Sequence, residues 1–225
     1  MQTILISGAN RGIGLELARQ FSAAGWSIVG TARRPDEATE LKALPGTEVL
    51  PLEATDPSSI DELVSRLGGR PIDVLIANAG VAIHLEATPV EVTREDFLAV
   101  LATNSFAPLA LAGALKPNLL AGQHRVAAAM SSLMSSITAN DWGTQYTYRA
   151  SKTGLNALWR ALAMEWRSIG ITAVLLRPGM VATRMTGYRG IPVEMSVAGM
   201  KMVVERLTPA DAGRLIGYDG SDVPW

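Results

Sequence analysis

A glycine-rich turn between a short apolar run and an amphipathic segment constrains the fold more than any other feature of the sequence. The run Thr3–Ser7 stops at the segment Gly8–Gly14, whose glycines have the spacing G-x-x-x-G-x-G. From Ile13 to Phe21, apolar residues then recur on one face of a helix. A strand, a glycine turn and a helix in this order are typical of an α/β sheet whose backbone approaches a phosphate group. A tight turn without a ligand is the alternative at this point.

Short apolar runs alternate with helical segments along the rest of the chain. Each run is nearly continuous, as in parallel strands that are buried on both faces. The predicted strands are Thr3–Ser7, Ser27–Thr31, Thr47–Leu52, Ile72–Ala77, Arg125–Met130, Ile171–Leu176 and Leu215–Tyr218. This alternation predicts a single α/β domain over residues 1–225, a Rossmann-type doubly wound parallel sheet of about seven strands with helices on both faces.

The composition of the 225 residues excludes several classes of protein. The chain has no cysteine and only two histidines, His84 and His124, so disulfides and thiolate metal sites are excluded and we expect no metal. The net charge is −1, with lysines and arginines scattered, so we expect no nucleic-acid or membrane partner. The first residues lack a signal-peptide pattern, and no uninterrupted apolar run reaches ~18 residues, so we expect a cytoplasmic protein.

Two arginines follow the second predicted strand. In NAD-binding domains an acidic residue about 20 positions after the glycine turn binds the adenosine ribose hydroxyls. Here that position lies near Ala32, and Arg33 and Arg34 come next. Guanidinium groups can bind a 2′-phosphate in a bidentate manner, and Arg11 in the glycine turn offers another cation. The pattern favours NADP(H) over NAD(H), with a solvated turn as the alternative.

Tyr148 and Lys152 are four residues apart in a predicted helix that extends to about Ile169, which places their side chains next to each other. A tyrosine normally titrates near pH ~10, and lowering its pKa by about three units costs roughly 4 kcal/mol. A cation about 4 Å away supplies a free energy of that order. We therefore expect an acid/base pair, the alternative being an ordinary pair on a helix surface. Tyr146 lies off the face of Lys152 and is excluded as its partner.

Small polar residues follow two other predicted strands. Asn78–Gly80 comes after the fourth and Ser131–Ser136 after the fifth, at the sheet edge where open α/β sheets bind ligands. Asn104 is unusual inside an Ala/Leu-rich helical stretch, 93–120, which Pro108 is predicted to kink. Its side chain either bonds a neighbouring carbonyl or has a functional role.

The segment 180–207 carries five of the nine methionines. Flexible thioethers suit an adaptable apolar pocket, so we expect a substrate-binding loop and helix there. The residues expected to line this pocket are Leu133, Met134, Trp142, Tyr146, Met180, Met185 and Met195.

Over nearly its whole length, the chain resembles the short-chain dehydrogenase/reductase family in its single-domain branch. The residues that carry this resemblance are Gly8, Gly12, Gly14, Asn78, Ala79, Gly80, Asn104, the serine cluster, Tyr148, Lys152, Pro178, Gly179 and Thr183. The ending Tyr218–Gly220 with Pro224 and Trp225 is similar to the carbonyl reductase-like, C-factor or sniffer-type subgroup. The family's extended branch of epimerases and dehydratases has an additional substrate domain, for which this chain is too short.

The resemblance implies that Tyr148 is the general acid that protonates a carbonyl oxygen as hydride arrives from a nicotinamide. Lys152 would lower the pKa of Tyr148 and hold the nicotinamide ribose, and Asn104 would anchor a water in a proton relay. A serine would orient the substrate oxygen. Ser132 is preferred for that role because it stands at the strand end, and Ser135 is the alternative because it lies 13 residues before the tyrosine.

The resemblance also implies a set of cofactor-binding residues. They are Gly8, Asn10, Arg11, Gly12, Ile13, Gly14, Arg33, Glu53, Asn78, Ala79, Gly80, Tyr148, Lys152, Pro178, Gly179 and Thr183. Glu53 stands where the family usually has an aspartate. The implied function is an NADP(H)-dependent oxidoreductase acting on a ketone, an aldehyde or the corresponding alcohol, and the alternative is an NADP(H)-binding regulatory or signalling protein with little turnover. We expect a homodimer that forms through the helices around Asn104 and Lys152.

Overall fold

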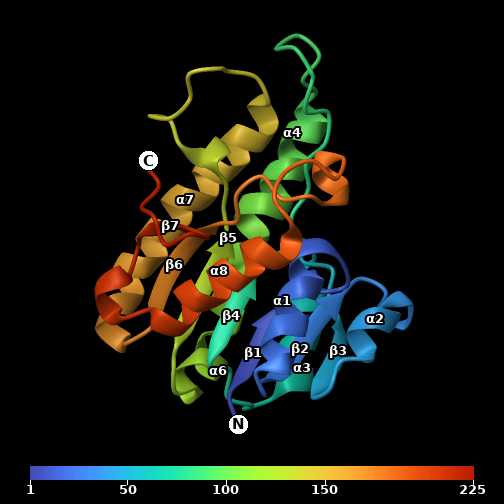
Figure 1. Ribbon diagram of the computed structural model, residues 1–225, viewed down its shortest axis with the longest axis vertical. Coiled ribbons are helices and arrows are strands. Elements are labelled where there is room, and N and C mark those ends of the chain that lie inside the picture. Colours follow the sequence, from blue (N-terminus) through green and yellow to red (C-terminus); the bar gives the residue numbers. More distant parts are fainter.

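The computed structural model describes residues 1–225, and its central feature is a sheet of seven strands (Figure 1). The strands are β1 Thr3–Ile6, β2 Ser27–Ala32, β3 Thr47–Pro51, β4 Val74–Ala77, β5 Val126–Met130, β6 Thr172–Arg177 and β7 Leu215–Gly217. Their order in the sheet is β3-β2-β1-β4-β5-β6-β7, and every neighbouring pair is parallel. All seven predicted strands are present, which confirms the doubly wound α/β fold.

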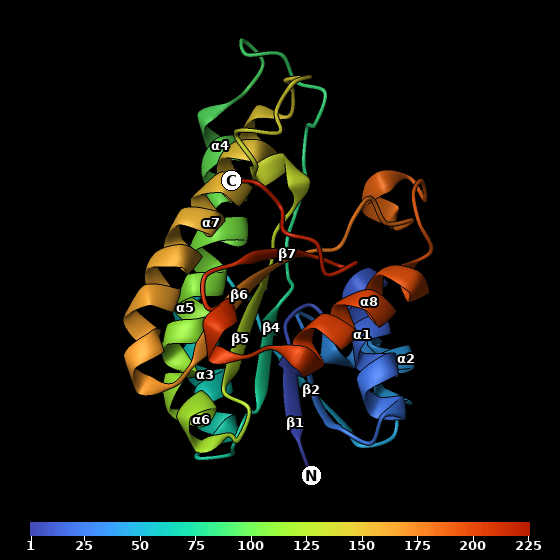
Figure 2. The same ribbon diagram turned by 60° about the vertical axis from the view of Figure 1, so that its left-hand side comes forward.

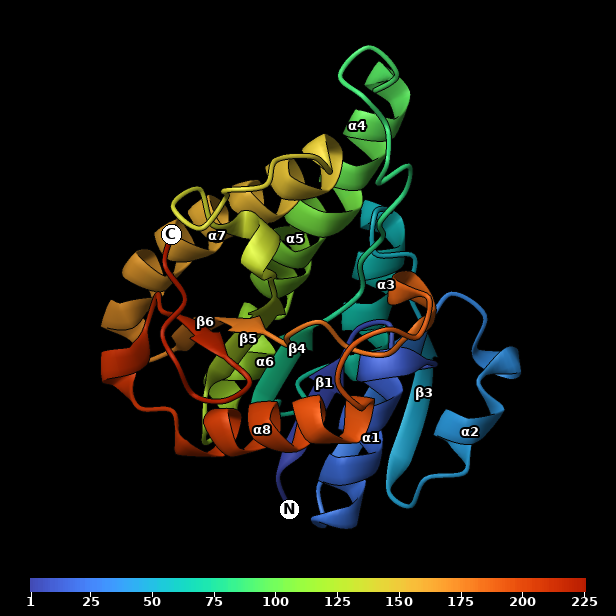
Figure 3. The ribbon, with the colours of Figure 1, turned by 45° about the horizontal axis from the view of Figure 1, so that its top comes forward.

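Helices cover both faces of the sheet. They are α1 Gly12–Ala23, α2 Thr39–Lys42, α3 Pro57–Leu67, α4 Arg94–Leu101, α5 Ala107–Ala114, α6 Lys116–Ala121, α7 Tyr146–Trp166 and α8 Val193–Arg206. Figures 2 and 3 show α1, α2 and α8 on one face and the other five helices on the opposite face. Each face has its own buried core, with Phe21 and Met200 on the first and Leu63 and Trp159 on the second. Burial on both faces explains why the strands are apolar without alternation.

The predicted helical stretch 93–120 is not continuous. A π-helical turn, Ala102–Phe106, separates α4 from α5. Proline has no backbone N–H, and its ring meets the carbonyl four residues earlier, so Pro108 disturbs the helix at Asn104. The expected irregularity is therefore present one turn before Pro108. A second break, before α6, has no counterpart in the sequence-based prediction.

The stretch Arg94–Ala114 is long and apolar enough to cross a membrane, judged by length and composition alone. In the fold, α4 packs beside α7, and α5 packs against α7 and β4. Leu111 and Ala112 are buried in the core of that layer. The apolar composition of this stretch therefore fits a helix that covers a sheet.

The sheet changes its winding direction between β1 and β4. From β1 the order continues outward through β2 and β3, and from β4 it continues through β5, β6 and β7. In open α/β sheets, ligands bind in the crevice outside the carboxyl ends of the strands at this switch point. The segments that follow β1, β4, β5 and β6 meet at this edge.

Candidate active site

The glycine turn joins β1 to α1 in a conformation that requires glycine. Gly8 and Gly12 have φ values of 66° and 53°, in the left-handed region that glycine adopts without a steric penalty. A Cβ atom at Gly14 would lie 2.3 Å from the Gly8 carbonyl oxygen. The start of α1 is therefore packed directly against the turn, and any side chain at Gly14 would displace it.

The first turn of α1 is open to an anion. It has no side-chain cap and no acidic residue, and Arg11 at the N-cap position is exposed. The first N–H groups of a helix have no intrahelical partner, and the helix dipole adds positive charge at that end. This arrangement fits the diphosphate of a dinucleotide.

Asn78 fastens the end of β4 to the glycine turn. Its Nδ2 atom donates hydrogen bonds to the carbonyl oxygens of Ser7 at 3.0 Å and Gly8 at 3.2 Å. The Ser7 hydroxyl accepts hydrogen bonds from the backbone N–H groups of Asn78 and Ala79, both at 3.0 Å. The structure therefore uses the Asn78 side chain to hold the turn. The sequence-based site residues do not include Ser7, because a serine at the end of a strand has no distinctive pattern.

Asn104 lies in the π-helical turn and is fully buried. Its Oδ1 atom accepts a hydrogen bond from the Val81 N–H at 2.9 Å, and its Nδ2 atom donates to the Val81 carbonyl at 2.8 Å and to Ser151 Oγ at 3.0 Å. A Cβ atom at Gly80 would lie 3.2 Å from Asn104 Oδ1 and 3.7 Å from Lys152 Nζ. Asn104 therefore fixes the segment after β4 and lies close to Lys152.

Tyr148 and Lys152 lie side by side on α7, as their spacing predicts. The Lys152 Nζ atom is 5.8 Å from the centroid of the Tyr148 ring. The same Nζ atom donates a hydrogen bond of 2.7 Å to the carbonyl oxygen of Met130 at the end of β5. Burial of the ammonium lowers the pKa of Lys152 to about 8.

The pKa of Tyr148 differs from the sequence-based expectation. Burial raises the pKa of this phenol above its ordinary value, and a hydrogen bond with Ser132 opposes the rise. The expected lowering by Lys152 is absent because Lys152, with a pKa of about 8, has already lost its charge at the higher pH at which the buried phenol titrates. The expectation of an acidified phenol is therefore wrong for this arrangement, in which Tyr148 keeps its proton at neutral pH.

The structure separates the two candidate serines. Ser132 contacts the Tyr148 hydroxyl, and its own Oγ atom accepts a hydrogen bond from the Met134 N–H at 3.1 Å. Ser135 is buried, and its hydroxyl donates a hydrogen bond of 2.5 Å to the Ser132 carbonyl. The side chain placed against the phenol is thus that of Ser132.

Arg33 and Glu53 lie at the carboxyl ends of β2 and β3. The Arg33 Nη1 atom is 3.9 Å from Glu53 Oε2, and the Arg33 side chain is 75% exposed. Arg34 instead pairs with Glu37 at 2.7 Å. Arg33 is thus the guanidinium at this edge that is held only weakly by the protein, and it can turn toward a phosphate.

The loop after β6 closes over the glycine turn. A Cβ atom at Gly12 would lie 3.7 Å from Thr183 Cγ2, so the two segments are in contact range. Pro178 is anchored to α8, because its carbonyl oxygen accepts a hydrogen bond of 2.6 Å from Ser196 Oγ. Gly179 has a φ of 83°, again in the left-handed region. Of the predicted cofactor residues in this loop, Thr183 therefore lies beside the glycine turn.

The apolar side chains expected around the substrate differ in exposure. Leu133 and Met134 are half-buried, and Leu133 packs against the core. The exposed members are Trp142, Tyr146, Met180, Met185 and Met195. These exposed residues come from the loop before α7, the start of that helix, and the predicted segment 180–207.

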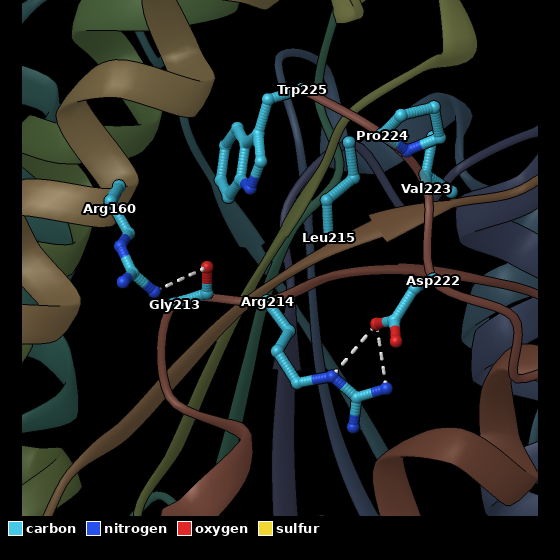
Figure 4. A pocket seen from close by; sticks show the side chains of 8 residues that line it. All are labelled: Arg160, Gly213, Arg214, Leu215, Asp222, Val223, Pro224 and Trp225. Atoms are coloured by element: carbon cyan, nitrogen blue, oxygen red, sulfur yellow. Dashed lines mark hydrogen bonds and ion pairs between the residues drawn. The ribbon is translucent and has the colours of Figure 1, made fainter.

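A separate hollow of about 470 Å³ lies between α7 and the end of the chain (Figure 4). Its charged groups already have partners. Arg214 donates hydrogen bonds to Asp222 at 2.7 and 3.0 Å, and Arg160 donates one to the Gly213 carbonyl at 3.1 Å. The predicted site residues lie elsewhere, at the carboxyl edge of the sheet.

The comparison with protein families decides the classification. A family model described as short chain dehydrogenase matches residues 2–191.

The chain belongs to the short-chain dehydrogenase/reductase family.

Several members of the family are similar to this chain over most of its length. The C-signal protein of Myxococcus xanthus is 39% identical over 156 residues, which cover 69% of this chain and 93% of that protein. The NADPH-bound carbonyl reductase from chicken fatty liver is 33% identical, with a TM-score of 0.91 and coverage of 100% of this chain and 99% of that one. The carbonyl reductase Sniffer of D. melanogaster is 29% identical, with a TM-score of 0.92 and complete coverage of both chains. These relatives confirm the predicted likeness to the carbonyl reductase-like, sniffer-type subgroup.

Proposed function

We propose that this short-chain dehydrogenase/reductase is an NADP(H)-dependent enzyme that reduces a ketone or an aldehyde to an alcohol. The observation that carries the proposal is the contact between the half-buried Tyr148 phenol and Ser132, with the Lys152 ammonium beside the phenol ring. Supporting it are the bound NADPH of the chicken carbonyl reductase and the bound NADP of a carbonyl reductase from Pseudomonas aeruginosa.

The residues at the crevice fit such a cofactor. The uncapped start of α1, with Arg11 at its N-cap position, suits the diphosphate, and the exposed Arg33 suits a 2′-phosphate. Thr183 covers the glycine turn from the loop after β6. When NADPH is bound, it supplies the hydride for the reduction.

Tyr148 is suited to the role of proton donor in the direction of reduction. Because burial raises its pKa, the phenol keeps its proton at neutral pH until a stronger base forms beside it. The oxygen of a carbonyl becomes such a base as it gains negative charge. Ser132, beside the phenol, orients the same oxygen and stabilises its charge.

Lys152 stabilises the phenolate that remains once the proton has left Tyr148. With a pKa of about 8, its ammonium is charged at neutral pH and neutral at higher pH. Its hydrogen bond to the Met130 carbonyl holds the ammonium in place beside the ring.

The test of this proposal is a cofactor-oxidation screen. The protein is mixed with NADPH or NADH and a panel of ketones, aldehydes and quinones, and the loss of reduced cofactor is followed. We expect oxidation of NADPH, faster than of NADH, with at least one carbonyl compound. Tight binding of NADPH with no oxidation across the panel would contradict an enzymatic role.

A second candidate is an NADP(H)-binding signalling protein with little turnover. It is favoured by the similarity to the protein named C-signal, which covers about two thirds of this chain. The contact of Tyr148 with Ser132 argues for the enzyme, because binding alone requires no proton donor. The screen described above distinguishes the two.

We also propose that the protein is cytoplasmic, that it forms a homodimer, and that residues 180–207 bind the substrate. Leu98, Phe106 and Met164 are large apolar side chains that are exposed on the helical layer of α4, α5 and α7. Such exposed apolar residues suit a contact with a second copy. Cell fractionation tests the location.

A further inference from the structure

A buried group of polar side chains lies behind Ser132, between β5 and α7. It consists of Ser131, Ser135 and Asn156, each of which is no more than 2% exposed. Buried polar groups are costly unless their hydrogen bonds are satisfied, so their arrangement is informative.

These side chains form a chain of contacts that ends at the Ser132 backbone. Ser131 Oγ lies 2.7 Å from the Asn156 side-chain oxygen and 3.2 Å from Ser135 Oγ. Ser135 Oγ in turn donates a hydrogen bond of 2.5 Å to the Ser132 carbonyl. This series of contacts thus connects Asn156 on α7 to Ser132, the residue next to Tyr148.

The number of protons restricts the direction of these hydrogen bonds. Each serine hydroxyl carries a single proton, and that of Ser135 is already used on the Ser132 carbonyl. If Ser131 donates to Asn156, no proton remains for the contact between the two hydroxyls. In that orientation the Asn156 NH₂ group is also buried without a partner.

A rotation of the Asn156 amide by 180° exchanges its oxygen and nitrogen within the same shape. The amide then donates to Ser131, Ser131 donates to Ser135, and Ser135 donates to the Ser132 carbonyl. Each hydroxyl proton has one acceptor, and the group left without a partner is a carbonyl oxygen, which proteins tolerate better than a buried N–H. Hydrogen bonds that point in one direction also strengthen one another.

We propose that Asn156 is a positioning residue that acts as a hydrogen-bond donor and holds Ser132 against Tyr148 through Ser131 and Ser135. Thr153 reinforces this link, because its Oγ1 atom donates a hydrogen bond of 3.0 Å to the Ser135 carbonyl. Since α7 also carries Tyr148, the phenol and the serine turn, residues 131–136, are tied to the same rigid helix. This inference depends on the proposed reduction of a carbonyl compound.

The test replaces the donor by an acceptor of the same shape, Asn156→Asp. An ionised carboxylate only accepts hydrogen bonds, whereas a protonated carboxyl can donate, and burial raises the pKa of such a carboxyl. At pH 8 we expect kcat to fall roughly tenfold, as for a small misplacement of a catalytic group, with an unchanged KM for NADPH. The ratio of variant to wild-type kcat should recover as the pH is lowered toward 6.

Two further variants complete the experiment. Ser131→Ala breaks the same chain without placing a charge in the core, so kcat should fall roughly tenfold with no recovery at low pH. Asn118→Asp is the matched control, because Asn118 is equally buried and donates hydrogen bonds to the carbonyls of Gly68 and Arg70, both at 2.8 Å. Asn118→Asp should lower the thermal stability, and the ratio of its kcat to the wild-type kcat should not change with pH.

The outcomes separate the inference from the function on which it depends. When the wild type turns over, full kcat in both Asn156→Asp and Ser131→Ala, or a loss in Asn156→Asp that low pH does not restore, overturns the donor role of Asn156. If Asn156→Asp does not fold, full kcat in Ser131→Ala overturns it. A wild-type protein without any turnover overturns the proposed function and this inference together.

Discussion

At the scale of single residues, the site depends on two neighbouring groups whose pKa values are set mainly by burial. The pKa of the Tyr148 phenol is raised, so its proton is retained, and that of the Lys152 ammonium is lowered to about 8. The sequence indicates that the two side chains are adjacent, because a spacing of four residues fixes this on a helix. It does not indicate how deeply each is buried, which depends on β5 and the serine turn.

Lys152→Met should stabilise the protein. A fall of the Lys152 pKa from 10.5 to about 8 corresponds to roughly 3 kcal/mol at about 1.36 kcal/mol per pH unit. The lost hydrogen bond to the Met130 carbonyl offsets about 1 kcal/mol. We expect a gain of about 2 kcal/mol in the free energy of unfolding at pH 7, measured with urea.

The pH dependence of this gain follows from the lowered pKa. Between pH 8 and 10.5 the unfolded wild type binds more protons than the folded one, so wild-type stability rises with pH in that window. The advantage of Lys152→Met should therefore be full below pH 8 and smaller at pH 9.5. A variant that is less stable at pH 7, or an advantage that does not change with pH, would contradict the burial of a charged Lys152.

Ser132 and Ser135 should differ in their effect on turnover. Ser132→Ala removes the hydroxyl that contacts Tyr148, and the loss of such a group costs roughly a hundredfold in kcat. Ser135→Ala weakens only the support of Ser132, so we expect a loss of roughly tenfold. Steady-state kinetics of both variants show which loses more kcat. A larger loss in Ser135→Ala would assign the contact with the reacting groups to Ser135.

At the scale of elements, the glycine turn is the best example of local structure that the sequence predicts. The G-x-x-x-G-x-G spacing after a strand requires a close approach of backbone segments, and Gly14 has no room for a Cβ atom. The π-helical turn around Asn104 is different, because Pro108 predicts a disturbance but not its form. That form depends on the Asn104 contacts with Val81 and Ser151, which come from distant parts of the chain.

Arg33→Ala should weaken NADPH binding selectively. The Arg33 guanidinium is held only by Glu53 at 3.9 Å and is the group suited to a 2′-phosphate. Loss of one charge-assisted hydrogen bond, about 1.5–3 kcal/mol, should raise the Kd for NADPH roughly tenfold or more and leave that for NADH unchanged. The matched control is Arg34→Ala, since Arg34 is paired with Glu37. Equal effects on both cofactors, measured by calorimetry, would argue against a 2′-phosphate site at Arg33.

At the scale of the whole molecule, the order of strands and helices could be predicted, but the contacts between distant segments could not. Continuous apolar strands alternating with helices leave few topologies open, and the sheet has the predicted seven strands. Ser7 and Asn156 escape prediction because polar residues become informative only through their partners. Asn78 illustrates the same limit, since its amide holds the glycine turn.

The exposed apolar residues of the helical layer predict a homodimer. Light scattering during size-exclusion chromatography should give about twice the mass of the 23.9 kDa chain. Phe106→Glu places a charge among the exposed residues of this layer and should shift the mass toward that of a single chain. A single-chain mass for the wild type at all concentrations would refute the dimer.

The central claim is that Tyr148 donates the proton in an NADPH-dependent reduction, and the most direct measurement compares the wild type with Tyr148→Phe. NADPH binding and single-turnover NADPH oxidation are measured with a carbonyl compound that the wild type reduces. We predict that Tyr148→Phe binds NADPH with an affinity within about twofold of the wild type but oxidises it at least roughly a hundredfold more slowly, as expected for loss of a general acid. A variant that oxidises NADPH at the wild-type rate would show that another group donates the proton.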